Sequence, residues 1–461
     1  MTNRKFGNWN FYKSCIYIAV PVMLQQLIMG LVSLIDNFMV AGLGDVKLAA
    51  VNVSNQLNFM FLVVLNTCYG AGGIYMAQNN GADNKAGMQE AFRFKVILPV
   101  IISTLYMTAI FIDPKFFISL LTHGNSAQAE ILDASAKYMT VLAISFIPTA
   151  ISGAIASSYR EIGKPKITLI ISVIATLINT FGNIVLIYGY LGVPRLEEKG
   201  AAIATVIARL AEMTIFIVYM KIHKEKFYVR TRDILKIKIK KFYEMIRKSS
   251  LIFFSEISWA LSEMFMTALY NSRGGAETVA GMAAGFTIAN IFFLVFQGIY
   301  VSSMVVVGGT LGKGDLDSAK NKARWILNGA FIAGSVIGLF EVSSTFLIPF
   351  VFSKLTESAQ IITRNLVILI SCYMPLWSYI NAQFAISRAG GDTLFGVAVD
   401  IPVSLFIFAP IALILYKYTT VGPVAMFGIS KLSDFAKVAI GSIMLKKERW
   451  VQKLTDNHNE V

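Results

Sequence analysis

Histidine, cysteine and charge are scarce in this sequence. Its 461 residues contain three histidines, all in predicted loops or tails, and three cysteines that are widely separated within apolar stretches. No spacing typical of a disulfide framework or of a Cys/His metal site is present. A group inside the apolar segments that carries a proton or a cation must therefore be a carboxylate.

Long polar stretches are also missing, and the longest is approximately Lys221–Lys248. The chain is 56% hydrophobic and 15% charged, with a mean hydropathy of +0.63, which excludes a soluble protein of this length. Apolar runs of about 20 residues, the length that crosses a hydrocarbon core about 30 Å thick, recur from end to end. The first run is too long for a cleavable signal and lacks an A-x-A site, so we expect it to remain as a span.

We predict an all-α membrane protein with about twelve transmembrane helices. Their approximate limits are 14–42, 47–78, 86–112, 129–159, 166–190, 199–222, 247–273, 278–311, 317–345, 357–389, 393–416 and 421–446. An even number places both termini on one side, and the concentration of Lys and Arg in the loops of that side makes it cytoplasmic. The net charge of +14 is therefore expected to reflect topology and contact with lipid headgroups rather than nucleic acid.

The two halves of the chain follow one plan. The corresponding motifs are Arg160-Glu-Ile-Gly163-Lys-Pro and Arg388-Ala-Gly-Gly391-Asp-Thr, Gly200-Ala-Ala and Gly422-Pro-Val, and the basic–acidic pairs Arg209/Glu212 and Lys431/Asp434. Six spans in each half give parallel repeats, and such repeats predict two pseudo-symmetric lobes around a central cleft. We expect an N-terminal lobe at 1–222, a basic cytoplasmic linker at 223–246, and a C-terminal lobe with its tail at 247–461.

Asp36 lies alone in the first apolar span. A carboxylate at membrane depth costs a few kcal/mol or more, so it indicates a functional site. Asn179 and Asn183 share one face of the fifth span, while Thr205 lies in the sixth and Tyr138 in the fourth. Such oxygen ligands suit a sodium ion, and the same set can instead tune the affinity of Asp36 for a proton. A purely structural hydrogen bond to a neighbouring helix is the alternative.

Further carboxylates occur in the second half. Glu256 and Glu263 lie seven residues apart on one face of the seventh span and are expected to line a wet cavity, unless they bond to a neighbouring helix. The two repeated basic–acidic pairs can neutralise each other within one helix and are expected to be structural. Asp400 and Glu341 are single carboxylates to which the sequence assigns no role.

In this order and spacing, the motifs resemble those of the multidrug and toxic compound extrusion (MATE) transporters over essentially the whole chain. They are Asp36 followed by Gly42-Leu-Gly44-Asp, the Arg160 turn, Asn179-x-x-x-Asn183, Gly200-Ala-Ala-Ile-Ala-Thr205, Ser255-Glu256-x-x-Trp259 and Arg388-Ala-Gly-Gly-Asp-Thr393. The resemblance implies twelve helices in two six-helix lobes and cation-coupled export of organic, often cationic, compounds.

The resemblance also implies site residues. In the DinF-like branch of the family, a first-helix aspartate and polar residues of helices four to six form the cation site. The matching positions look like Asp36, Tyr138, Asn179, Asn183 and Thr205, with asparagine at 183 where that branch usually has aspartate. In the NorM-like branch a seventh-helix glutamate, which looks like Glu256, works with a tenth-helix aspartate. Trp377 stands at about that aspartate's position, with Tyr373 one turn before it.

These observations predict an inner-membrane antiporter rather than an enzyme, driven by an inward H⁺ or Na⁺ gradient and coupled at Asp36. Glu256 and Glu263, with Tyr373 and Trp377, are expected to contact the cationic amphipathic substrate or an auxiliary cation. We expect a monomer in the lipid bilayer with no cofactor, no nucleic-acid partner, and no metal other than a monovalent cation at Asp36.

Two other functions were weighed against the antiporter. A flippase for lipid-linked oligosaccharide or polysaccharide precursors needs a basic cavity for a pyrophosphate, and its candidates Arg209 and Lys431 both have acidic neighbours. A membrane-embedded hydrolase or transferase needs a metal cluster or a nucleophile–base pair within the spans, and the sequence shows neither.

Overall fold

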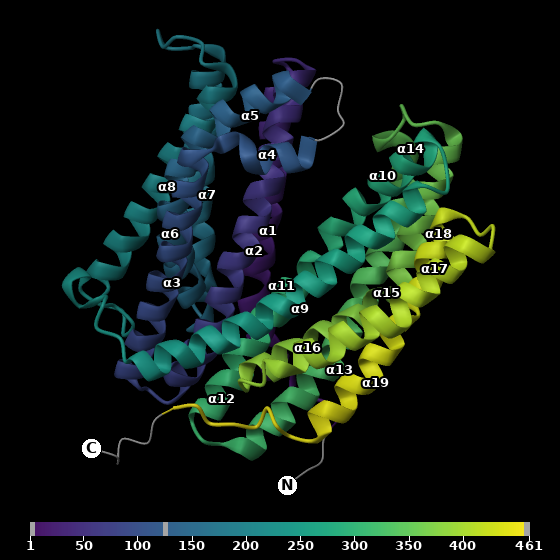
Figure 1. The fold of residues 1–461 in the computed structure, drawn as a ribbon. Coiled ribbons are helices and arrows are strands. Elements are labelled where there is room, and N and C mark those ends of the chain that lie inside the picture. The colour runs from purple at the N-terminus through teal and green to yellow at the C-terminus, as the bar shows by residue number, and fades with distance from the viewer. Residues whose placement is uncertain (1–4, 123–127, 456–461) are drawn as a thin grey trace. The chain divides into compact units, whose positions relative to one another are not determined.

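The computed structural model describes residues 5–122 and 128–455, and within these ranges regular secondary structure is helical throughout (Figure 1). His123 and His458 lie outside the described residues. The helices of the first half are α1 (Trp9–Ala41), α2 (Asp45–Gly81), α3 (Lys85–Ile112), α4 (Pro114–Thr122), α5 (Gln128–Leu142), α6 (Phe146–Glu161), α7 (Pro165–Tyr188) and α8 (Glu197–Ile222). Those of the second half are α9 (Ile239–Asn271), α10 (Ala276–Phe292), α11 (Leu294–Ser303), α12 (Gly309–Gly312), α13 (Leu316–Ser343), α14 (Ile348–Val351), α15 (Glu357–Ala389), α16 (Leu394–Val403), α17 (Ala409–Tyr418), α18 (Pro423–Lys431) and α19 (Ser433–Lys446).

Ten helical stretches of the described chain are long and apolar enough to cross a membrane. Several labelled helices join end to end in one stretch, as α10 to α12 do in Ala276–Gly312. The other two predicted spans correspond to α9, which carries three glutamates, and to α18 with α19, which are separated at Leu432. The predicted all-helical membrane architecture is confirmed.

Contacts divide the chain into two units. The first unit comprises Leu24–Met76 and Asn84–Ile246, and the second comprises Met1–Met23, Ala77–Asp83 and Arg247–Val461. The start of α1 and the end of α2 thus belong to the same contact unit as the second half of the chain. The lobe boundaries and the central cleft stay predictions.

The core of the first unit is built on stacked aromatic rings. Phe61 of α2, Tyr106 of α3 and Phe146 of α6 have ring centroids 4.7 to 5.1 Å apart. Leu65 and Met139 are buried in the same cluster. Beside this core, α7 and α8 pack along each other (Figure 1). This packing fixes the positions of α7 and α8, the helices that carry residues predicted to surround Asp36.

The predicted linker is packed on the first unit. Phe227 is fully buried, with its ring centroid 5.3 Å from those of both Phe92 and Tyr159. Lys164 pairs with Glu225 at 2.8 Å. The ion pair of Lys241 with Glu90 (3.0 Å) attaches the first turn of α9 in the same way. The basic segment is therefore a folded part of the first unit.

In the second unit, α15 packs against α10, α13 and α19. Small residues permit the close approach, since a Cβ added at Gly338 of α13 would lie 2.6 Å from the carbonyl oxygen of Ser371 in α15. Buried Leu366 and Ile370 of α15 belong to the apolar cluster of this unit.

Candidate cation and substrate site

Asp36 is held by amides of α7. The side-chain nitrogen of Asn183 donates to Asp36 Oδ1 at 2.7 Å. Asn179 lies one helical turn earlier on the same face. In the amide orientation that satisfies both of its neighbours, its nitrogen donates to Asp36 Oδ2 at 3.1 Å and its oxygen accepts from Thr205 of α8 at 3.3 Å. The structure thus brings four of the five predicted cation-site residues into one hydrogen-bonded group.

A buried acceptor next to this group has no partner among the residues that the structure describes. The side-chain oxygen of Asn183 is inaccessible to solvent and accepts no hydrogen bond from them, and the residue as a whole is 2% exposed. An orphaned buried acceptor costs about 1–3 kcal/mol. Tyr138, the fifth predicted residue, is 5% exposed and lines the same cavity as Asp36. If the Asn183 amide turned its oxygen toward Asp36, a proton or a cation there would give that oxygen a partner.

The group borders a cavity of about 390 Å³ within the first unit, formed by α1, α2, α5, α7 and α8. Its polar lining includes a set of asparagines that the sequence analysis did not identify, namely Asn37, Asn52, Asn55 and Asn58. The signal was present in the sequence, because three of them recur at three-residue intervals inside an apolar span.

A network of hydrogen-bonded polar side chains runs from the cavity wall to α1. Arg209 and Glu212 form the predicted intrahelical ion pair at 2.7 Å. The Ser172 hydroxyl donates to Glu212 at 3.2 Å and accepts from the Gln25 amide at 2.8 Å. Gln25 lies four residues after Pro21 in α1, so this network of side chains connects α7 and α8 to α1 near its proline.

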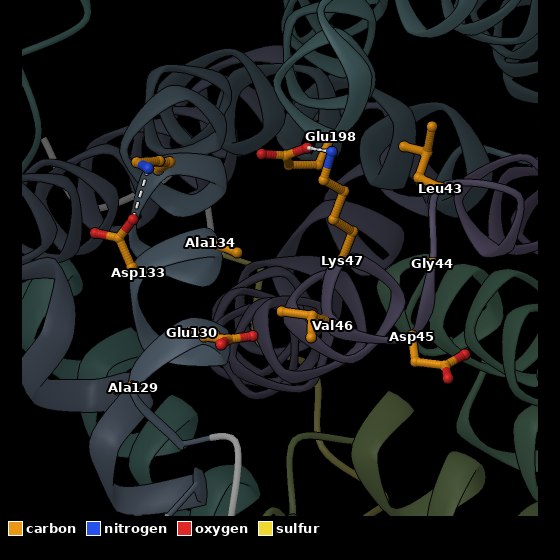
Figure 2. A pocket seen from close by; sticks show the side chains of 11 residues that line it. Leu43, Gly44, Asp45, Val46, Lys47, Ala129, Glu130, Asp133, Ala134 and Glu198 are labelled. Carbon is orange, nitrogen blue, oxygen red and sulfur yellow. Dashed lines mark ion pairs between the residues drawn. The ribbon is translucent and has the colours of Figure 1, made fainter.

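A wider hollow of about 640 Å³ lies where α1 turns into α2 (Figure 2). Figure 2 shows Lys47 extending toward Glu198, from which it is separated by 3.5 Å, and Asp133 paired with Lys137 at 2.5 Å. Asp45 and Glu130 also line this hollow, and both of these carboxylates are exposed, whereas Asp36 is partly buried.

Glu256 and Glu263, the glutamates of α9 that were expected to line a wet cavity, are paired with cations. Glu256 contacts the guanidinium of Arg388 at 2.7 Å, and Glu263 contacts the ammonium of Lys431. The predicted intrahelical pairing of Lys431 with Asp434 was wrong. The interruption at Leu432 breaks the helical spacing on which that prediction depended, and the structure pairs Lys431 with another helix.

Tyr373 and Trp377 lie one turn apart on α15 with their rings stacked at 5.4 Å. The indole nitrogen of Trp377 donates to Asp434 at 2.8 Å, and the Tyr373 hydroxyl donates to the carbonyl of Gly428 at 2.7 Å. Both side chains therefore attach α15 to α18 and α19.

The remaining carboxylates of the second half differ in their surroundings. Asp400 accepts from the Ser255 hydroxyl at 2.7 Å and pairs with Lys437 at 3.0 Å. Lys437 also lies 3.7 Å from Asp434 on its own helix, and the sequence analysis did not identify it as a partner of Asp400 because the two lie on different helices. Glu341 is fully buried, and neither of its carboxyl oxygens has a hydrogen-bond partner within residues 5–122 and 128–455.

Comparisons with known proteins agree with this architecture. The MatE family model matches residues 21–185 and 252–414, one segment in each half of the chain. Among curated proteins, a probable multidrug resistance protein NorM of Photorhabdus laumondii is 26% identical over 318 residues, which cover 68% of this chain and 67% of that protein. The probable multidrug resistance protein YoeA of Bacillus subtilis is 24% identical over 452 residues, which cover 94% of both.

Solved structures share the fold. A mutant of the Vibrio cholerae MATE transporter VcmN superposes with a TM-score of 0.84 at 15% identity, over 96% of this chain and 98% of that one. An outward-facing multidrug resistance MATE family transporter of the MOP superfamily gives a TM-score of 0.80 at 18% identity, over 94% and 96% of the two chains.

Proposed function

Because this chain belongs to the MatE family of multidrug and toxic compound extrusion transporters, we propose that it is an H⁺- or Na⁺-coupled antiporter that exports cationic amphipathic compounds by alternating access. The chain is a multi-pass membrane protein of a family of small-molecule transporters rather than of enzymes. We place it in the inner membrane as a monomer with both termini in the cytoplasm, as the distribution of Lys and Arg favours.

The environment of Asp36 carries the proposal. Two amides donate to its carboxylate, and the Asn183 oxygen beside it lacks a partner in the part of the chain that the structure describes. A proton on Asp36 can be donated to that oxygen once the Asn183 amide turns, and a sodium ion can be bound by both residues. Either ion changes the hydrogen bonds between α1 and α7, and linkage makes the effects of ion and substrate on each other reciprocal.

Coupling is centred on the first unit in this proposal. Glu256 and Glu263 already have cationic partners in Arg388 and Lys431, so an added substrate cation must compete with these ion pairs. Asp36 has only neutral hydrogen-bond donors among its direct partners. A cation therefore gains more at Asp36 than at either glutamate.

The flippase alternative gains no support from the geometry. It requires a cation available to bind pyrophosphate within the spans. Arg209 is paired with Glu212, and Lys431 is paired with Glu263. Binding a pyrophosphate at either cation would leave a carboxylate unpaired, which costs several kcal/mol at a buried site.

The test is transport by purified protein in proteoliposomes, driven by a sodium gradient alone or by a pH gradient alone. We expect one of the two gradients to drive efflux in the wild type. Asp36→Asn should abolish this efflux without loss of folding, because the amide of asparagine can neither exchange a proton nor balance the charge of a cation. Asp45→Asn, which removes an exposed carboxylate at the start of α2, is the matched control and should transport normally. Gradient-driven efflux by Asp36→Asn at the wild-type rate would refute the proposal.

A further inference from the structure

Glu341 is a carboxyl group that the proposed coupling at Asp36 does not use. It lies in α13 of the second unit, fully buried, and among the described residues neither of its oxygens has a hydrogen-bond partner. An ionised carboxylate is strongly disfavoured in such a place, because burial removes its hydration and nothing replaces it. A neutral carboxylic acid avoids this penalty, but its O–H then needs an acceptor.

Glu341 continues the face of α13 that packs on α15. The buried residues of this face recur every three or four positions and include Gly334, Gly338 and Glu341. A Cβ added at Gly334 would lie 2.6 Å from the Met374 carbonyl oxygen, and one at Gly338 would lie 2.6 Å from the Ser371 carbonyl oxygen. Because the side chains of an α-helix lean toward its N-terminus, the Glu341 side chain is directed back toward Gly338 and the carbonyl beside it.

Pro375 leaves an acceptor at this contact. Proline has no N–H, so the carbonyl four residues earlier in a helix loses its usual donor, and in α15 that carbonyl belongs to Ser371. It is the same carbonyl against which Gly338 packs. A buried acceptor without a donor is unfavourable. The helix that lacks a donor is therefore packed against the helix that carries an unpartnered carboxyl group.

The surroundings favour the neutral acid over the carboxylate. On α15, the Ser371 hydroxyl donates to the Val367 carbonyl at 2.6 Å and the Thr363 hydroxyl donates to a main-chain carbonyl at 2.8 Å, so both donors are already used. The other charged residues of α13 lie in its first three turns. The charged residues of α10 and α15 are either exposed or, for the last one, paired with Glu256, and they are Glu277, Glu357, Arg364 and Arg388.

We propose that Glu341 is a proton-binding site of the second unit, a neutral carboxylic acid whose O–H donates to the Ser371 carbonyl and bridges α13 to α15 at its proline. Beyond Pro375, α15 carries Trp377 and Arg388, which bind Asp434 and Glu256. The bridge thus fixes the direction in which α15 presents these groups. The proton is held by the fold instead of being exchanged during transport, so the inference holds whichever ion drives the protein.

Infrared difference spectroscopy of the full-length protein in nanodiscs tests the proton. At neutral pH, the wild-type spectrum minus that of Glu341→Gln should contain the C=O stretch of a protonated carboxyl group, and subtraction of the Glu341→Leu spectrum should show the same band. Glu357→Gln is the matched control, because it removes an exposed carboxylate at the start of α15 and should remove no such band. Absence of the band from both Glu341 difference spectra would overturn the inference.

The same measurement separates this site from the coupling site. Asp36→Asn should leave the Glu341 band in place, because the two carboxyl groups belong to different units. Failure of Asp36→Asn to abolish transport would therefore refute the proposed function alone, and a missing Glu341 band would refute this inference alone.

A double-mutant cycle tests the acceptor. Pro375→Ala restores an N–H that can donate to the Ser371 carbonyl, so the donor at position 341 is needed less. Glu341→Leu should lower the temperature of thermal unfolding at least about twofold more in the wild-type background than in the Pro375→Ala background. Glu341→Gln should keep most of the wild-type value, because its amide can donate to the same carbonyl.

Equal losses from Glu341→Leu in the two backgrounds would overturn the bridge to Ser371. If Pro375→Ala does not fold, the comparison of the two Glu341 variants decides the matter. A loss from Glu341→Gln as large as that from Glu341→Leu would show that no hydrogen bond is donated from position 341.

Discussion

Adjacent glycines in α2 make room for a buried ion pair between α3 and α6. Lys95 Nζ lies 2.5 Å from Glu161 Oε2, and the lysine side chain is fully buried. A Cβ at Gly72 would lie 2.3 Å from Lys95 Cγ, and one at Gly73 would lie 2.2 Å from Glu161 Oε1. The side chains of the pair thus occupy the space that a larger residue on α2 would fill.

We expect Gly73→Ala to displace the Glu161 carboxylate from Lys95. Separating a buried ion pair leaves two charges without compensation, so the variant should lose about 3 kcal/mol of stability. Thermal unfolding of the purified protein in detergent measures the loss. Gly30→Ala is the control, because an added Cβ there meets nothing within 4 Å. Equal unfolding temperatures for Gly73→Ala and the wild type would contradict the expected displacement.

Residue identities predicted local geometry better than long-range contacts. Asn179 and Asn183 were expected to share a face because four residues make about one helical turn, and both lie beside Asp36. The partner of Lys431 could not be predicted in the same way. Glu263 is far from it in sequence, and only the packing of α9 against α18 brings the two together.

At the scale of elements, hydropathy predicted the apolar parts of helices. The third span, expected at 86–112, is α3 at Lys85–Ile112. The seventh was expected to begin at 247, but α9 begins at Ile239 because its first turns are polar and lie beyond the apolar segment. The interruption at Leu432 and the π-helical turn at Met304–Gly308 give no hydropathy signal at all.

The packed linker leads to a second stability prediction. Phe227→Ala removes a fully buried ring that contacts Phe92 and Tyr159, and it should cost about 3–5 kcal/mol. Most of the linker's lysines and arginines are already exposed, and loss of this anchor should loosen the backbone around them and so speed cleavage by trypsin. Limited proteolysis in detergent, followed by mass spectrometry of the fragments, measures the change.

A matched variant separates packing from a general effect of truncation. Leu235 lies in the same linker and is 80% exposed, so Leu235→Ala should leave the cleavage rate unchanged. Equal cleavage of both variants would show that Phe227 does not anchor the linker.

At the scale of the whole molecule, three helices belong to both contact units. The boundaries fall after Met23 in α1, after Met76 in α2 and after Ile246 in α9. For α1 the boundary lies two residues beyond Pro21, which stands inside the helix that carries Asp36. Sequence patterns predicted the repeat but not these shared helices, because contact boundaries depend on packing rather than on hydropathy.

The start of α9 is anchored in the first unit, where the Tyr75 hydroxyl donates to Glu244 and Met245 is buried. The same helix continues into the second unit, where Glu256 binds Arg388. A continuous helix transmits rotation and translation between the parts that hold its two ends, and alternating access requires coordinated movement. The shared helix is therefore expected to couple conformational change in one unit to the other.

Inserting Gly-Gly between Ile246 and Arg247 should uncouple the two parts of α9, because glycine weakens helix continuity and two extra residues rotate the remainder of the helix. We expect gradient-driven efflux from proteoliposomes to fall at least about tenfold, while the helix content of the purified protein, measured by circular dichroism, is retained. The same insertion after Gly192, an open turn position with nothing within 4 Å of an added Cβ, controls for chain length and should transport normally. Wild-type efflux by the α9 insertion would show that coupling between the units does not depend on this helix.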